Sequence, residues 1–160
     1  MATSEARTGA MHMIVPGIRE RRAIDRHLTA FFRTYGSSRF RRAIAAISRF
    51  YHLRSPRVHW FEYLDWGKSG GRCMEDGQVF LVHPENWKRG RKYNSERKWI
   101  NTVYHEMGHY VLWADAERKA DAFACRFVRG VSVNGRRRAM GRRPAMQSRL
   151  QRRRRRARSR

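Results

Sequence analysis

Cysteine is scarce in this sequence, with only Cys73 and Cys125 among 160 residues. Two thiols cannot supply the disulfide framework of a small secreted domain, and neither belongs to a C-x-x-C metal or redox pair. The redox chemistry of cellular compartments then favours two reduced thiols in a cytosolic protein.

Long apolar runs are missing too, since no stretch approaches the roughly 18 consecutive apolar residues of a membrane-spanning helix. The first residues, MATSEARTGAMHMIVPG, hold no continuous apolar segment after a basic start, which a secretory signal would require. We therefore expect a soluble, cytoplasmic protein that does not contact membranes.

Acidic residues are few, with 13 Asp and Glu against 37 Lys and Arg and a net charge of +24. The shortage is uneven, because Asp121 is the last acidic residue and fifteen arginines follow in residues 122–160. Hydrophobic residues make up 41% of the chain, enough to bury a core. We expect one domain, residues 17–130, between a flexible N-terminus, residues 1–16, and a disordered Arg-rich tail, residues 131–160.

The Arg-rich tail has two interpretations. Thirteen arginines lie between Arg136 and Arg160, and each can neutralise a phosphate and release its counterion. The tail would then bind nucleic acid without base specificity and with strong salt dependence. No zinc-finger, helix-turn-helix or aromatic RNA-binding signature accompanies it, so a purely solubilising extension is the alternative.

Helical periodicity marks the first part of the predicted domain. Apolar residues recur at helical spacing from Ile18 to Tyr35, and Gly36 ends the pattern. A second amphipathic helix follows Ser38 and must stop before Pro56. Arginines occupy its other face, either as a solvated surface or as a grip on phosphate.

Two strands should follow these helices. Residues 57–66, RVHWFEYLDW, are rich in aromatic and branched side chains, and residues 78–83, QVFLVH, form an apolar run after the turn signal at residues 75–77. Residues 67–73, GKSGGRC, lack the order of a phosphate-binding loop, and we interpret them as a connection. We interpret residues 83–94, HPENWKRGRKYN, as a polar connection as well.

The next predicted helix, capped by Asn94 or Ser95 and ending near Trp113, contains the motif H-E-x-x-H. At 100° per residue, His105 and His109 lie about 40° apart and one turn along, so both imidazoles can reach one cation. Glu106 points about 100° away from His105, where it can hold a water. The apolar positions cluster on the opposite side of the helix: Ile100, Val103, Tyr104, Met107 and Val111.

A catalytic zinc takes three protein ligands and leaves one position for water. No histidine follows His109, so a third ligand downstream must come from Asp115, Glu117, Asp121 or Cys125. A helix predicted to begin near residues 114–116 and to end near Val128 puts Glu117 and Asp121 on one face. We favour Glu117 as the ligand, with Asp121 or Asp115 as the alternatives, and Asp121 as the acceptor of the other ring N–H of a ligating histidine. For the pair His105 and His109, the alternative to zinc ligation is a coincidental polar face.

The sequence HEMGH followed by E-R-K-A-D-A-F-A resembles the zincin metallopeptidases of the Glu-ligand type, most closely the ImmA/IrrE family. That family's pattern continues with E-x-E-A-N/D-x-F-A, and Lys119 stands here at its middle Glu. The upstream run GGRCMEDGQVFLVHPENW is similar to SprT-like zinc proteases, whose third histidine is absent. The resemblance spans about residues 57–128.

The resemblance implies a minimal zincin-like α+β domain. Its small antiparallel or mixed sheet would pack on the H-E-x-x-H helix and on the following Glu-bearing helix, with two N-terminal helices added. Residues 78–83 would form the sheet edge that pairs with an extended substrate.

Such a site implies hydrolysis of a peptide bond in a protein or peptide substrate. Zinc would polarise the substrate carbonyl and acidify its bound water, and Glu106 would act as general base and then as general acid. Candidates for stabilising the oxyanion are His83, Tyr104 and Tyr110.

Functions from two classes compete. The first is a zinc metallopeptidase that acts on an intracellular protein, and the resemblance suggests a DNA-bound transcriptional regulator. The second is a nucleic-acid-binding protein that uses the Arg-rich tail and keeps a structural or vestigial zinc site. A regulatory zincin that senses a partner without cutting it is a third reading. The sequence leaves the substrate and the oligomeric state open.

Overall fold

The computed structural model describes residues 13–61, 70–90 and 95–131. The predictions for residues 1–12, for the Arg-rich tail from residue 132 onward, for residues 62–69 and for residues 91–94 lie outside the described residues. The described elements are α1 (Ile18–Thr34), α2 (Ser37–Phe50), β1 (Val58–Phe61), β2 (Gly71–Cys73), β3 (Val79–Val82), α3 (Pro84–Arg89), α4 (Glu96–Leu112) and α5 (Glu117–Val128).

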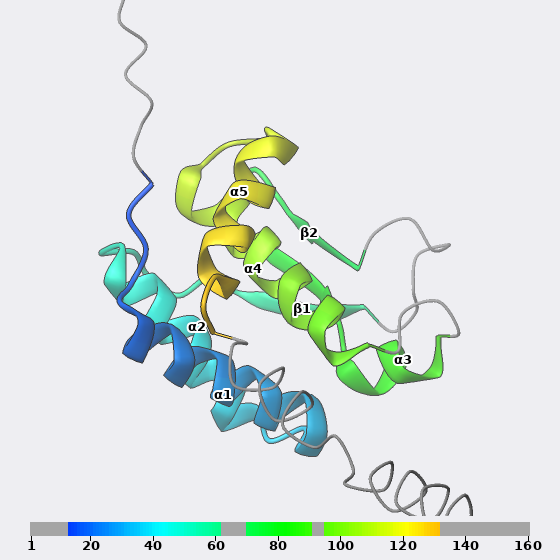
Figure 1. Ribbon diagram of the computed structural model, residues 1–160. Coiled ribbons are helices and arrows are strands. Elements are labelled where there is room, and N and C mark those ends of the chain that lie inside the picture. Colours follow the sequence, from blue (N-terminus) through cyan, green and yellow to red (C-terminus); the bar gives the residue numbers. More distant parts are fainter. Residues whose placement is uncertain (1–12, 62–69, 91–94, 132–160) are drawn as a thin grey trace, which may run out of the picture.

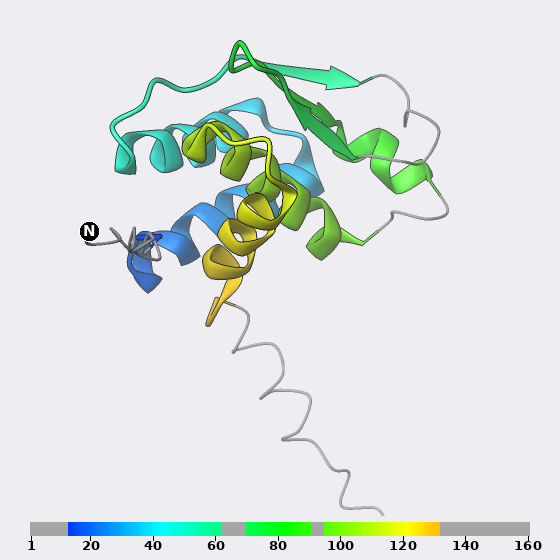
Figure 2. The ribbon, with the colours of Figure 1, turned by 90° about the horizontal axis from the view of Figure 1, so that it is seen from above.

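The described residues form an α+β fold with five helices and a three-stranded mixed sheet (Figure 1). This arrangement confirms the expected α+β class with a small mixed sheet, whereas the zincin-like identity stays a prediction. Figures 1 and 2 place α4 between the sheet and α1, with α5 alongside α4. No helix in the described residues combines the length and apolarity needed to cross a membrane.

The helices follow the apolar spacing of the sequence. α1 buries Ile24, Leu28, Phe31 and Phe32 on one face, and it ends where Tyr35 adopts a left-handed conformation with φ 60°. The Tyr35 N–H then donates to Phe31 O, one of the last carbonyl oxygens of the helix. α2 packs back against α1, as the predicted pair of N-terminal helices requires.

The sheet differs from the expected one in two respects. β3 is its central strand, parallel to β1 and antiparallel to β2, so the prediction that residues 78–83 form the edge is wrong. The edge beside α4 is β2, and residues 71–73 are therefore a strand where a connection was predicted. The turn at Gly77, with φ 83°, joins β2 and β3 as a hairpin, and a hairpin turn requires a strand on both sides.

A short helix replaces part of the second predicted connection. His83 accepts a hydrogen bond from the Glu85 N–H, and Pro84 occupies the first helical position, so α3 has both a cap and a preorganised start. Trp87 of α3 is buried. Residues 84–89 are therefore helical, and the interpretation of this segment as a connection is wrong because its capping signal was overlooked.

The core joins α4 to the sheet and to α1. Trp99 is fully buried, and its indole N–H donates to Val82 O of β3 at 2.8 Å. Phe31 packs against the same indole with ring centroids 5.7 Å apart. Two residues earlier, in the first turn of α4, Arg97 forms a two-nitrogen salt bridge with Asp25 of α1. These contacts fix α4 on both sides.

α5 is fastened at its C-terminal end by α1. The Arg21 guanidinium donates to the carbonyl oxygens of Arg126, Phe127 and Arg129, which have no partner within the helix. A cation at a helix C-terminus also interacts favourably with the helix dipole. Arg126 donates in turn to Met13 O, in the segment that precedes α1.

Close packing of α4 on α5 depends on a residue without a side chain. A Cβ added at Gly108 would lie 3.1 Å from Ala120 Cα and 3.0 Å from Phe123 Cβ. The α5 backbone could make room for this Cβ only if the two helices moved apart. The glycine inside HEMGH therefore sets the distance between the two helices.

Replacing Gly108 with Ala should lower the free energy of unfolding by about 1–3 kcal/mol, the usual cost of overpacking. This loss exceeds the gain of about 1 kcal/mol that alanine normally brings to a helix interior. Urea unfolding measures the difference, and Gly17→Ala, where a Cβ meets nothing within 4 Å, is the control. A Gly108→Ala protein as stable as the wild type would contradict the close-packing argument.

Candidate metal centre

The two histidines of the motif stand on a helix whose limits match the prediction. Ser95 caps α4 by accepting a hydrogen bond from the Lys98 N–H, and the helix ends at Leu112. The face expected to be apolar is buried, with Ile100, Val103, Tyr104 and Met107 at 0–1% exposure. The opposite face presents His105 and His109, both half-buried.

A left-handed turn brings α5 back onto this face. Trp113 adopts φ 49° and ψ 46°, and its N–H donates to His109 O, which closes the end of α4. α5 begins four residues later, so Glu117 is its first residue. The short segment between His109 and Glu117 can therefore reverse direction because Trp113 adopts a conformation that residues with a side chain rarely adopt.

Three metal-ligating atoms converge at this point. His105 Nε2 lies 3.0 Å from one Glu117 carboxylate oxygen, and His109 Nε2 lies 3.2 Å from the other. The two Nε2 atoms are 3.2 Å apart. Of the residues that the structure describes, His105, His109 and Glu117 form the group able to hold a metal ion, with ligand atoms within 4.8 Å of one another.

The second ring nitrogen of each histidine has its own partner. His105 Nδ1 lies 2.8 Å from Asp121 Oδ1, one turn after Glu117 on α5. His109 Nδ1 lies 2.7 Å from Ala114 O, in the turn that follows Trp113. A carbonyl oxygen can only accept, so His109 Nδ1 is the donor there, and an ionised Asp121 requires the same of His105 Nδ1.

These hydrogen bonds fix what the Nε2 atoms can do. In a neutral imidazole whose Nδ1 carries the proton, Nε2 presents a lone pair. Two such lone pairs and the Glu117 carboxylate then face one another at about 3 Å, and this contact is repulsive unless a cation lies among them. A proton added to one Nε2 atom could form a hydrogen bond across only one of these three contacts.

The separations fit a zinc ion. Zinc binds imidazole nitrogen at about 2.0–2.1 Å and carboxylate oxygen at about 2.0–2.2 Å, and in a tetrahedron such ligands stand about 3.3 Å apart. The measured separations, 3.0 Å and 3.2 Å, approach that value. The donor set of two imidazoles and one carboxylate also leaves one tetrahedral position for water or substrate.

Glu106 occupies a different environment from Glu117. Its side chain is turned toward β2 and the residue is only 5% exposed, whereas the Glu117 side chain is 73% exposed. Burial raises the pKa of Glu106, while the neighbouring His105 and His109 act in the opposite direction. A carboxylate with a raised pKa accepts a proton more readily, which suits a general base.

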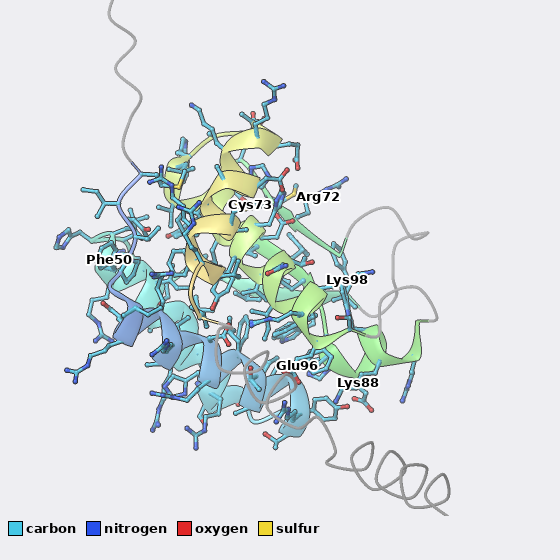
Figure 3. All side chains as sticks on the ribbon, in the orientation of Figure 1. Phe50, Arg72, Cys73, Lys88, Glu96 and Lys98 are labelled. Carbon is cyan, nitrogen blue, oxygen red and sulfur yellow. The ribbon has the colours of Figure 1, made fainter. Side chains whose placement is uncertain are left out.

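β2 holds Glu106 in place, and the sequence prediction missed this strand. The Cys73 backbone N–H donates to the Glu106 carboxylate, and Figure 3 shows Cys73 on β2. A Cβ on Gly71 would lie 2.6 Å from Glu106 Cγ, so only glycine lets the strand come this close. The Gly70-Gly71 pair before the turn at Gly77 was the available signal.

Two cavities open beside the three ligand atoms. One, of about 600 Å³, is lined by Glu106 together with His105, Glu117 and Asp121. The other, of about 400 Å³, is lined by His109, Cys73 and the exposed side chains of Met74 and Trp113. The candidate centre thus borders one cavity on the side of His105 and another on the side of His109.

The remaining predicted residues lie away from the three ligand atoms. Asp115 and Cys125 line the cavities but do not belong to the group able to hold a metal, which leaves Glu117 as the candidate third ligand. The Tyr104 hydroxyl donates to Asp25 of α1, and the Tyr110 hydroxyl donates to Arg54 O.

The His83 ring packs against Phe31 and Trp60. It lies on the β1 side of the central strand β3, whereas Glu106 contacts β2 on the other side. None of the three proposed oxyanion donors, His83, Tyr104 and Tyr110, lines either cavity. Their assignment from the sequence was wrong, because packing and other hydrogen bonds occupy these side chains.

Comparison with protein-family models, with curated proteins and with solved structures found no match. The case for a metal centre therefore rests on the geometry of α4, α5 and β2.

Substitution of a ligand should remove the metal. We expect the purified wild-type chain to contain one zinc per molecule, and His105→Ala and Glu117→Ala to contain less than about a tenth of that, since three ligands are the minimum for such a site. Elemental analysis after dialysis measures the content. Full zinc retention by Glu117→Ala would place the third ligand elsewhere.

Asp121 should tune the affinity without being a ligand. Asp121→Asn keeps an oxygen acceptor but loses the negative charge beside the His105 ring, so zinc affinity should fall by about 10–100-fold, the usual effect of such a partner. Competition with a chromophoric chelator gives the dissociation constant. The matched control is Asp115→Asn, whose carboxylate bonds to neither histidine, and an equal loss in both variants would show that only overall charge matters.

Proposed function

We propose that this chain is a zinc-dependent metallopeptidase that hydrolyses peptide bonds of an intracellular protein. The observation that supports this best is the convergence of His105, His109 and Glu117 beside a buried carboxylate, Glu106, at an open cavity. A purely structural zinc site would use four protein ligands and needs neither a buried base nor a cavity. The resemblance of HEMGH and of the following Glu-bearing helix to the ImmA/IrrE zincins agrees with the same proposal.

In the proposed reaction, zinc held by the three ligands supplies Lewis acidity toward the substrate carbonyl and toward water. Glu106 takes the proton of the attacking water and transfers it to the leaving amine nitrogen, so one carboxyl group serves as base and then as acid. The Cys73 N–H holds the Glu106 carboxylate in one orientation during both transfers. Asp121 and Ala114 O hold the two imidazoles in the tautomer that binds a metal.

The edge strand β2 offers a place for the substrate backbone. Gly70 and Met74 form hydrogen bonds with β3 and with Gln78 beside it, so the backbone groups of Gly71 and the carbonyl of Cys73 between them point away from β3. The Cys73 N–H is already bound to Glu106. An extended peptide that adds to this edge would pass beside Glu106. The role that we assigned to residues 78–83 therefore passes to residues 71–73.

A DNA-bound regulator as substrate remains part of the proposal, and it rests on the resemblance alone. Nucleic-acid binding through the Arg-rich tail is the competing proposal, and residues 132–160 lie outside the described residues. The competing proposal pairs the tail with a structural or vestigial zinc site, and the buried Glu106 beside an open cavity weighs against the structural form.

Glu106→Gln should retain zinc and lose hydrolysis. The amide fills the same space but cannot accept a proton, so the rate should fall by about 10²-fold or more, which is the usual contribution of a general base. The assay follows cleavage of a degenerate peptide mixture by mass spectrometry, beside zinc content from elemental analysis.

The matched control is Glu85→Gln, on an exposed carboxylate of α3, which should leave both quantities unchanged. Equal cleavage by Glu106→Gln and wild type would exclude the proposed mechanism. Absence of cleavage by a zinc-loaded wild type would favour the structural or sensory role.

A further inference from the structure

The two N-terminal helices carry a basic surface that the candidate metal centre does not use. α2 contains no acidic residue, and its four arginines are all exposed: Arg39, Arg41, Arg42 and Arg49. The exposed Arg26 of α1 lies close enough to act on the same neighbour, His27, as Arg39 and Arg42 do. Figure 3 shows nitrogen-tipped side chains that project outward from these helices. We call Arg26, Arg39, Arg41, Arg42 and Arg49 the α1–α2 arginine surface.

No carboxylate in the described part of the chain neutralises this surface. Asp25 of α1 is engaged by Arg97, and Glu96 of α4 is engaged by Arg33. The remaining acidic residue of α1, Glu20, stands in its first turn. The arginines of α2 form no ion pair with any described residue, so their charge is free for an external anion.

The surface is also hollowed between its arginines. Ala45 and Ala46 floor a depression of about 540 Å³, and Arg42 and Arg49 stand on its rim. No acidic residue lines this depression. Two alanines in a row of arginines leave room for a group to approach the helix and reach more than one guanidinium.

His27 lies beside the same arginines and is affected by their positive charge. Its Nδ1 is buried and has no hydrogen-bond partner among the described residues. Burial lowers the pKa of His27, and the positive charges of Arg39, Arg42 and Arg26 lower it further. A bound anion would offset this positive field.

We propose that the α1–α2 arginine surface binds the phosphodiester backbone of a nucleic acid. Arginine pairs bidentately with phosphate oxygens, and an unpaired cluster gains affinity by releasing counterions. Arg42 and Arg49 are two helical turns, about 10 Å, apart along α2, so their side chains can reach different phosphates of one backbone. The binding is independent of base sequence, of the Arg-rich tail and of the proposed peptidase chemistry.

An anionic membrane is the less suitable partner for this surface. Helices that lie on membranes insert large apolar side chains beside their cationic ones. Among the described residues, no exposed large apolar side chain lies on α2, and α1 carries one, Ile18, at its first position. A phosphate backbone needs only the charges and the small alanines.

The test uses the full chain with Arg42→Gln and Arg49→Gln combined. The probes are a 20-base-pair DNA duplex and an RNA duplex of equal length, with affinity measured by fluorescence anisotropy between 50 and 300 mM salt. Loss of two phosphate contacts should weaken binding about tenfold and should flatten the slope of log K against log salt by about two. Comparison of the two duplexes shows which backbone is preferred.

The control removes two other exposed arginines, Arg72 of β2 and Arg118 of α5, which form no ion pair with a described residue. Figure 3 shows Arg72 at the far end of the molecule from α1. Arg72→Gln with Arg118→Gln changes the net charge equally and should alter the slope by less than half as much. Equal changes in both double variants, or no change in either, would overturn the proposal.

Two further measurements keep the test decisive. Arg42→Lys with Arg49→Lys keeps both charges and should restore the wild-type slope, and circular dichroism checks that each variant is folded. Vesicles of phosphatidylserine and phosphatidylcholine form the membrane arm. If Arg42→Gln with Arg49→Gln abolishes vesicle binding and leaves duplex binding intact, the surface serves a membrane and the proposal is wrong.

Discussion

The close approach of α4 and α5 is the constraint on which the candidate centre depends. Gly108 lets the backbone of α5 come within contact of α4, and the left-handed turn at Trp113 returns the chain at once. Arg21 fastens the far end of α5 to α1. These three local features place the first residue of α5, Glu117, over the two histidines of α4.

Electrostatic interactions among these groups explain why the arrangement favours a bound cation. Each Nδ1 donates a hydrogen bond, His105 to Asp121 and His109 to Ala114 O, so the lone pairs of both Nε2 atoms face the Glu117 carboxylate. Without a cation or added protons, the two lone pairs and the carboxylate would repel one another. The same fold buries Glu106 against β2 and raises its pKa, which separates the roles of two glutamates eleven residues apart.

Much of this was predictable from the sequence because the signals were local. The caps and apolar periods of α1, α2, α4 and α5 fixed their limits to within a few residues, and the i, i+4 pairs placed His105 with His109 and Glu117 with Asp121. The gap between the two helices was the uncertain step, since a left-handed Trp113 has no sequence signature.

The sheet was less predictable because strand order is a tertiary property. β2 is short, glycine-rich and polar, so it lacks the alternation that identifies a strand, and its position at the edge follows from pairing with β3. The contacts of Gly71 and Cys73 with Glu106 were invisible for the same reason. The oxyanion candidates failed because a residue type does not show which partner a hydroxyl finds in the fold, as Tyr104 shows by bonding to Asp25.

The molecule thus separates two kinds of surface. One face assembles imidazole and carboxylate groups around a small volume, and the helices α1 and α2 present unpaired guanidinium groups.

The identity of the ligands is the central claim, and zinc K-edge X-ray absorption of the purified full chain tests it most directly. Our account predicts nitrogen and oxygen neighbours at about 2.0–2.2 Å, including two imidazole rings and no sulfur. A sulfur shell at about 2.3 Å, or a chain that binds no zinc, would contradict it.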